Sequence, residues 1–182
     1  MIGFVGRLVR DKGVVELATA WRSLREDYPS LHLLVVGRRE AQDPVPPETM
    51  STLESDPRVH VTGELCDLPP VYTAMDVFVL PTYREGLSLA LLEAAAMCLP
   101  CVATRVTGST DAIVEGATGT LVPAGDAGAL AGAIRSYLDN LPLSRAHGLA
   151  GRAFVLEHFP REAIWEALLA EYQACLAAKD SA

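Results

Sequence analysis

Short apolar runs alternate with amphipathic stretches along the whole chain of 182 residues. Continuous apolar runs of about four to eight residues, bounded by turn residues, are typical of strands in a sheet that is covered on both faces. Apolar positions that recur every three or four residues indicate helices instead. Six runs have strand character: Ile2–Val5, Leu31–Val36, Val59–Thr62, Asp76–Leu80, Cys101–Thr104 and Thr120–Val122.

Helical patterns follow these runs in regular alternation. We expect helices over Val14–Tyr28, Glu48–Glu54, Leu68–Met75, Ser88–Met97, Ser109–Glu115, 127–139, 143–158 and 161–178, with Asp126 as the N-cap of the helix over 127–139. Strands that alternate with helices predict an α/β fold with a doubly wound, parallel, six-stranded, Rossmann-like sheet. We divide the chain into one such domain over residues 1–160 and a C-terminal helix over 161–182.

Composition narrows the class of protein. Half of the residues are hydrophobic, and the net charge of −8 argues against nucleic acid as the main partner. No apolar run approaches the roughly 18 residues of a transmembrane span, and the first residues form a core strand rather than a signal peptide. Four cysteines in a chain of this length are compatible with a reducing cytosol. We therefore expect a cytoplasmic protein.

Cys98 and Cys101 have the spacing of redox or zinc motifs. The motif closes a predicted helix here, whereas a reactive thiol is favoured at the start of a helix, and a second pair needed for zinc is absent from the sequence. We interpret both cysteines as small apolar residues. The four histidines have no metal-ligand spacing, so we interpret them as structural and expect no metal site.

Two carboxylates, Glu85 and Glu93, frame the start of the helix expected after the fourth strand. Ser88 is a plausible N-cap, and the first N–H groups of a helix are unpaired and bind anions. Carboxylates suit sugar hydroxyls, so the arrangement fits a nucleotide-sugar. After the first strand, Arg7 and Lys12 lie five residues apart and could neutralise a diphosphate without a metal. A solvated basic loop is the alternative.

These two spaced motifs support recognition of a family. Gly6-Arg7-x4-Lys12-Gly13 and Glu85-x7-Glu93 occur with Leu34-Val-Val-Gly37, Ala74-Met-Asp-Val-Phe-Val-Leu-Pro81 and Gly119-Thr-Leu-Val-Pro123. Over essentially its whole length the chain resembles the C-terminal, donor-binding domain of retaining glycosyltransferases of family 4, the glycogen-synthase-like enzymes of GT-B architecture. The stretch around Tyr83 to Gly86 further resembles enzymes that act on polyprenyl-diphosphate-linked glycans and capsules.

The resemblance implies transfer of a sugar from a nucleotide-sugar, UDP-linked, to a glycan or lipid-linked acceptor without a metal or other cofactor. It implies that Arg7 and Lys12 bind the donor diphosphate and that Glu85 contacts the transferred sugar, and these are the expected catalytic residues. Glu93 would accept hydrogen bonds from the ribose. The other expected donor-binding residues are Gly6, Gly63, Leu65, Gly86, Leu87, Ser88 and Leu89.

The chain departs from the family pattern in four respects, one of which is Thr107-Gly108-Ser109-Thr110-Asp111 where the family has Gly-Gly-x-x-Glu. Gly37 is followed by Arg38-Arg39-Glu40 where Gly-x-Gly is common, and Cys98 falls where a glycine usually ends a helix, so we expect a small backbone strain there. The family's N-terminal, acceptor-binding domain is missing, and the resemblance implies that the full enzyme could be peripheral at the inner face of the membrane. The last helix, which in the family crosses to that domain, presents Trp165, Leu168, Leu169, Tyr172 and Leu176 on one face; the alternative is that it packs on its own sheet.

Two further functions stay open at this point. The chain could be a nucleotide-sugar-binding module that is inactive alone, or an epimerase-like enzyme acting on nucleotide-sugars. The pattern of Arg7 and Lys12 argues against the epimerase. Because an acceptor domain would be needed to complete the cleft, we expect the isolated chain to be inactive in transfer.

Overall fold

Six parallel strands form a single sheet in the computed structural model, which describes residues 1–180 without the side chains at 161, 163, 164, 178 and 180. The strands are β1 (Ile2–Val5), β2 (Leu33–Val36), β3 (Val59–Gly63), β4 (Val77–Leu80), β5 (Cys101–Thr104) and β6 (Gly119–Val122). Their order is β3-β2-β1-β4-β5-β6, and all neighbours pair in parallel. The predicted doubly wound six-stranded sheet is confirmed.

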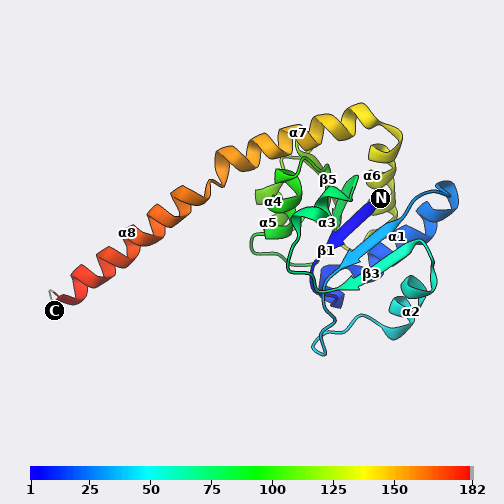
Figure 1. Cartoon of the computed structure of the whole chain (residues 1–182), viewed down its shortest axis with the longest axis horizontal. Helices are drawn as coiled ribbons and strands as arrows, with labels where there is room; N and C mark the ends of the chain where they lie inside the picture. The colour runs from blue at the N-terminus through cyan, green and yellow to red at the C-terminus, as the bar shows by residue number, and fades with distance from the viewer. Residues whose placement is uncertain (181–182) are drawn as a thin grey trace.

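Helices cover both faces of the sheet (Figure 1). They are α1 (Val14–Asp27), α2 (Pro47–Ser55), α3 (Pro69–Thr73), α4 (Leu89–Ala96), α5 (Thr107–Ala112), α6 (Ala127–Asp139), α7 (Leu141–His158) and α8 (Arg161–Asp180). Helix α1 packs with α2 and α6, and α4 packs with α5 and α7. Because of these two layers, every residue of β1, β4 and β5 is buried, which explains why their sequences are apolar throughout rather than alternating.

Side-chain caps fix several helix starts. Asp126 Oδ1 accepts a hydrogen bond from the N–H of Ala129 at 2.8 Å at the start of α6. Asn140 Oδ1 accepts from the N–H of Leu143 at 3.1 Å at the start of α7. Each cap satisfies one of the N–H groups that a helix leaves unpaired in its first turn. The predicted cap at Asp126 is therefore confirmed.

The position predicted for the fifth helix is wrong. We expected it over Ser109–Glu115, but α5 spans Thr107–Ala112. The N–H of Val114 donates to Thr118 Oγ1 at 2.8 Å, and the N–H of Thr118 donates to the carbonyl of Val114 at 2.9 Å. This turn uses the backbone groups of Val114 that a longer helix would need, so the helix ends before it.

The end of α4 has a left-handed residue, as the sequence indicated. Cys98 has a φ of 62°, one of two positive φ values among the described non-glycine residues. Its N–H donates to the carbonyl of Ala95 at 2.9 Å, and the N–H of Leu99 donates to the carbonyl of Ala94 at 3.0 Å. These bonds satisfy the last carbonyls of the helix, which is the reason that chains adopt this conformation at a helix end. A residue with a Cβ is strained in it.

Helix α8 projects away from the sheet and its layers, past the end of α7 (Figure 1). The alternative in which the last helix packs on its own sheet is therefore wrong. Its large apolar side chains are between 52% and 69% exposed: Trp165, Leu168, Leu169, Tyr172 and Leu176. Neither α8 nor any other helix in the described residues combines the length and apolar character needed to span a bilayer.

Candidate donor-binding site

Lys12 and Glu85 meet at the carboxyl edge of the sheet, although 73 residues separate them in the sequence. Lys12 ends a single 3₁₀ turn after β1, and Glu85 lies in the loop between β4 and α4. Lys12 Nζ donates to Glu85 Oε1 at 2.6 Å, and the two side chains are only 13% and 16% exposed. β1 and β4 are neighbours at the point where the strand order reverses. Doubly wound folds bind their ligands in the crevice at this point.

The loops that carry these two residues are packed directly against each other. The N–H of Tyr83 donates to the carbonyl of Asp11 at 2.8 Å, and Thr82 Oγ1 donates to the same oxygen at 3.1 Å. Gly13 has a φ of 70°, and a Cβ there would overlap the carbonyl oxygen of Pro81. A glycine is needed at this point because only glycine combines that backbone conformation with so close an approach.

The start of α4 presents free backbone donors next to Glu85. Ser88, which is 3% exposed, accepts a hydrogen bond from the N–H of Leu91 at 3.3 Å, so the predicted N-cap is confirmed. In the described part of the chain, the N–H groups of Gly86 and Leu87 donate to no protein acceptor. On the other side of this loop, a Cβ at Gly108 would overlap the carbonyl oxygen of Gly86. The carbonyl side of this loop therefore packs against α5. The N–H groups of Gly86 and Leu87 remain available to an anion.

Glu93 is held by a residue that the sequence analysis did not identify. Tyr72 on α3 donates its hydroxyl to Glu93 Oε2 at 2.7 Å. Burial of Tyr72 and this hydrogen bond together raise the pKa of its phenol well above the usual value, so the hydroxyl stays a donor. The signal was available, because a tyrosine in an apolar helical pattern requires a partner for its hydroxyl. Glu93 itself is exposed, so the bond orients an accessible carboxylate.

Arg7 does not join Lys12 and Glu85 in this structure. Its Nη1 donates to Glu40 Oε2 at 3.1 Å, and Arg38 Nε donates to the other oxygen of the same carboxylate at 3.2 Å. Glu40 follows β2, so the Arg7 guanidinium is engaged on the β2 side of the edge, whereas Lys12 is engaged on the β4 side. The two predicted cations are thus split between two carboxylates. Arg7 remains 58% exposed and is accessible to a ligand.

A pocket of about 320 Å³ lies beside Arg7, at the carboxyl ends of the first three strands. Three of the predicted residues line it, namely Gly6, Arg7 and Leu65. Glu64, which follows β3, also lines it. Gly63 ends β3, where its carbonyl accepts a hydrogen bond from the N–H of Gly37 at 2.8 Å. The remaining predicted residues, Leu87 and Leu89, are 43% and 68% exposed. The pocket is separate from the Lys12–Glu85 contact but lies along the same edge.

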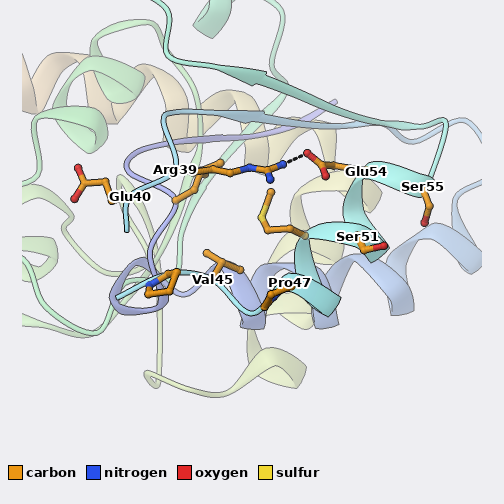
Figure 2. Close-up of a pocket in the computed structure, with 10 residues that line it drawn as sticks. Arg39, Glu40, Val45, Pro47, Ser51, Glu54 and Ser55 are labelled. Atoms are coloured by element: carbon orange, nitrogen blue, oxygen red, sulfur yellow. Dashed lines mark hydrogen bonds and ion pairs between the residues drawn. The ribbon is translucent and has the colours of Figure 1, made fainter. Parts of the chain in front are cut away.

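A second pocket, of about 430 Å³, contains none of the predicted residues. Figure 2 shows Arg39 extending from the loop after β2 toward Glu54 on α2, with Val45 and Pro47 on the opposite wall. Arg39 and Glu54 form an ion pair with each other, so neither offers an uncompensated charge to a ligand. The pocket is a concavity between α2 and the loop that precedes it.

The cysteines and histidines are consistent with structural roles. Cys98 and Cys101 are both unpaired, and burial raises the pKa of the Cys101 thiol to about 12, so this thiol is inert rather than nucleophilic. His147 Nδ1 lies 2.7 Å from the hydroxyl of Tyr137 in a buried contact. Within residues 1–180 as described, no group of three or more potential ligands is arranged to hold a metal ion.

The sequence and the fold of this chain are similar to those of known glycosyltransferases. The chain is 35% identical over 176 residues to the capsular polysaccharide biosynthesis glycosyltransferase CapM of Staphylococcus aureus, an alignment that covers 97% of this chain and 46% of CapM. Sucrose-phosphate synthase from Thermosynechococcus elongatus superposes with a TM-score of 0.83 at 33% identity, over 97% of this chain and 45% of that protein. HepE from Anabaena, solved with UDP-glucose, superposes with a TM-score of 0.86 at 22% identity, over 95% and 48%; this likeness shows the fold.

The chain thus spans less than half the length of each of these relatives. The model of the family "Glycosyl transferases group 1" matches residues 1–140, a segment that includes all six strands of the sheet and every predicted site residue. By this match, the chain belongs to the glycosyl transferases group 1 family.

Proposed function

We propose that this chain is the donor-binding half of a retaining glycosyltransferase that moves a sugar from a UDP-sugar to a glycan or a lipid-linked acceptor. The observation that carries the proposal is the contact of 2.6 Å between Lys12 and Glu85 beside the start of α4. It brings a cation suited to phosphate next to a carboxylate suited to sugar hydroxyls. Membership of the family gives the reaction class and favours transfer over epimerisation.

The donor diphosphate binds Lys12, Arg7 and the free N–H groups of Gly86 and Leu87. Backbone donors at a helix start and a partly buried ammonium both favour a polyanion. Arg7 is exposed and can turn from Glu40 to a phosphate, for which its planar guanidinium is suited. Glu85 accepts hydrogen bonds from the hydroxyls of the transferred sugar once Lys12 has turned to the diphosphate.

The nucleoside binds farther along the edge. Glu93, oriented by Tyr72 at 2.7 Å, accepts hydrogen bonds from the ribose hydroxyls. The pocket lined by Gly6 and Leu65 then accommodates the base, with the end of β3 at Gly63 beside it. A uracil base is favoured because HepE, which has the same fold, was solved with UDP-glucose.

The chemical step needs no metal and no covalent intermediate. The bond between the anomeric carbon and the diphosphate oxygen breaks, and the acceptor oxygen bonds to the same face of that carbon. The acceptor proton passes to the departing phosphate oxygen. Lys12 and Arg7 stabilise the negative charge that accumulates on the diphosphate as the bond breaks. Glu85 orients the sugar and is not the nucleophile.

An acceptor-binding domain completes the enzyme. The exposed apolar face of α8 suits packing against such a domain, because its five large side chains are more than half exposed in the described structure. The four unpaired cysteines suit a reducing compartment, so we propose the cytoplasm as the site of action, at the membrane surface when the acceptor is a lipid.

A radiolabelled-donor assay tests the proposal. The chain alone should bind UDP-sugar and give negligible transfer, because nothing positions an acceptor hydroxyl for attack. Transfer should appear when an acceptor domain of a family member is supplied in cis or in trans. Robust transfer by the purified chain alone would contradict the assignment as a half-site. Failure of UDP, GDP and ADP sugars to raise the melting temperature of the chain would contradict donor binding itself.

A further inference from the structure

An ion pair lies directly beside the Lys12–Glu85 contact. Arg84 Nε donates to both carboxylate oxygens of Asp11, at 3.2 and 3.0 Å, and its Nη2 lies 3.0 Å from Asp11 Oδ2. Asp11 immediately precedes Lys12, and Arg84 immediately precedes Glu85. The pair therefore joins the two loops next to the residues assigned to the diphosphate and to the sugar.

Tyr83 adds two further contacts, one to α1 and one to the loop after β1. The hydroxyl of Tyr83 donates to Glu16 Oε1 at 2.7 Å, and the N–H of Tyr83 donates to the carbonyl of Asp11 at 2.8 Å. Three consecutive residues after β4 thus contact the segment after β1. Several contacts side by side fix the relative position of two segments more closely than one contact can.

We expect donor binding to break one of these contacts between the loops and to leave the others in place. If the ammonium of Lys12 turns to a phosphate and the carboxylate of Glu85 turns to a sugar, their contact of 2.6 Å is lost. The ion pair of Asp11 and Arg84 then still joins the two loops. Positioning of reacting groups is sensitive to shifts of about 1 Å, so this ion pair matters most when the ligand is bound.

The exposure of the pair separates this role from a role in folding. The Arg84 side chain is 82% exposed and that of Asp11 is 27% exposed. An ion pair in which one partner is this exposed contributes little to the free energy of folding. A large effect on ligand binding with a small effect on stability would therefore identify positioning.

We propose that Asp11 and Arg84 are positioning residues for donor binding, whose ion pair holds Lys12 and Glu85 at the separation that a diphosphate-linked sugar requires. This inference rests on the proposed function, because it takes Lys12 and Glu85 as the residues that contact the donor. It assigns neither Asp11 nor Arg84 a contact with the donor itself.

The test is a double-mutant cycle of Arg84→Gln and Asp11→Asn, read by calorimetry with UDP-glucose and with UMP. Each single variant should weaken UDP-glucose binding by about tenfold, and the double variant should be no weaker than either, because one pair is being broken. UMP binding should change by less than about twofold, since UMP lacks both the second phosphate and the glucose. Arg84→Lys, which keeps the charge, should recover part of the affinity.

Arg135→Gln is the matched control, because Arg135 forms an ion pair with Asp27 at the far end of α1. It should leave both affinities unchanged. Additive losses in the double variant, or equal losses for UMP and UDP-glucose, would overturn the proposal.

Amide exchange gives a readout that does not need a ligand. The N–H of Tyr83 donates to Asp11, so its exchange should be several-fold faster in Arg84→Gln than in the parent, while amides of β4 are unchanged. If the parent binds neither UDP nor UDP-glucose, the proposed donor class fails, and exchange alone decides whether the pair couples the loops. Equal exchange rates in parent and variant would then overturn the coupling.

Discussion

Lys12 Nζ donates to Glu85 Oε1 at 2.6 Å. The Glu85 carboxylate therefore lies where the donor diphosphate would contact Lys12, and the Lys12 ammonium lies where the sugar would contact Glu85. Both side chains are more than four-fifths buried. A donor must therefore exchange this contact for contacts of its own, one to phosphate and one to sugar. The consequence is that the two residues should respond differently to ligands that carry only one of these groups.

Replacement of Lys12 should weaken nucleoside-diphosphate binding. We expect Lys12→Ala to lower the binding free energy of UDP by about 1.5–3 kcal/mol, the range for a hydrogen bond to a charged group. Calorimetry with UDP measures this. The other lysine of the chain, Lys179, lies exposed on α8, and Lys179→Ala should bind UDP as the parent does. Unchanged UDP affinity in a folded Lys12→Ala variant would contradict the assignment.

Replacement of Glu93 and replacement of Glu85 should weaken the binding of different ligands. Glu93→Gln should weaken binding of UDP itself, because the ribose loses a charged acceptor, by about 1.5–3 kcal/mol. Glu85→Gln should leave UDP binding intact but weaken UDP-sugar binding or transfer, since only the sugar reaches this residue. Titrations of both variants with UDP and with UDP-glucose give the comparison. Equal loss of UDP affinity in the two variants would show that the roles are assigned wrongly.

Replacement of Cys98 by glycine should stabilise the folded chain. Its φ of 62° lies in the left-handed region, where a Cβ is unfavourable and glycine is not. We expect Cys98→Gly to raise the free energy of unfolding by about 0.5–1 kcal/mol. Cys98→Ala is the control, because it removes the thiol and keeps the Cβ, and it should give no gain. Urea denaturation of the two variants distinguishes release of strain from loss of the sulfur.

Asp56 should contribute to stability at neutral pH and less in acid. Burial acts to raise its pKa, but hydrogen bonds from the Arg58 N–H and from Trp21, with the charge of Arg25, outweigh it and lower the pKa below the usual value. A lowered folded-state pKa stabilises the fold above about pH 4, and this contribution is lost as the pH falls through the folded-state pKa.

The variant Asp56→Asn tests this pH dependence. It should lower the free energy of unfolding at pH 7 by about 1.5–3 kcal/mol, and the difference from the parent should shrink at pH 3. Asp67→Asn, at an exposed position, should match the parent at both values. Chemical denaturation at the two pH values measures the effect, and a constant difference would rule out titration of Asp56 as its source.

Local signals in the sequence determined the elements of the fold. Continuous apolar runs marked β1 and β5 with their correct bounds, because a strand buried on both faces has no polar side to alternate with. The caps at Ser88 and Asp126 were also predicted, since each depends on a hydrogen bond to a group three residues away. Spacing within short motifs likewise singled out Arg7, Lys12, Glu85 and Glu93, and the resemblance to a known family supplied the other candidate donor residues.

Only the tertiary structure decided which of these residues meet. Sequence spacing joined Arg7 with Lys12, yet the fold pairs Arg7 with Glu40 and Lys12 with Glu85. It also brought Tyr72 to Glu93 from a different helix. Each contact depends on which strands are neighbours in the sheet, and β1 lies between β2 and β4 although β2 and β3 come between β1 and β4 in the chain. Short motifs carry no information about that order, because it is set by how the strands and helices bury one another.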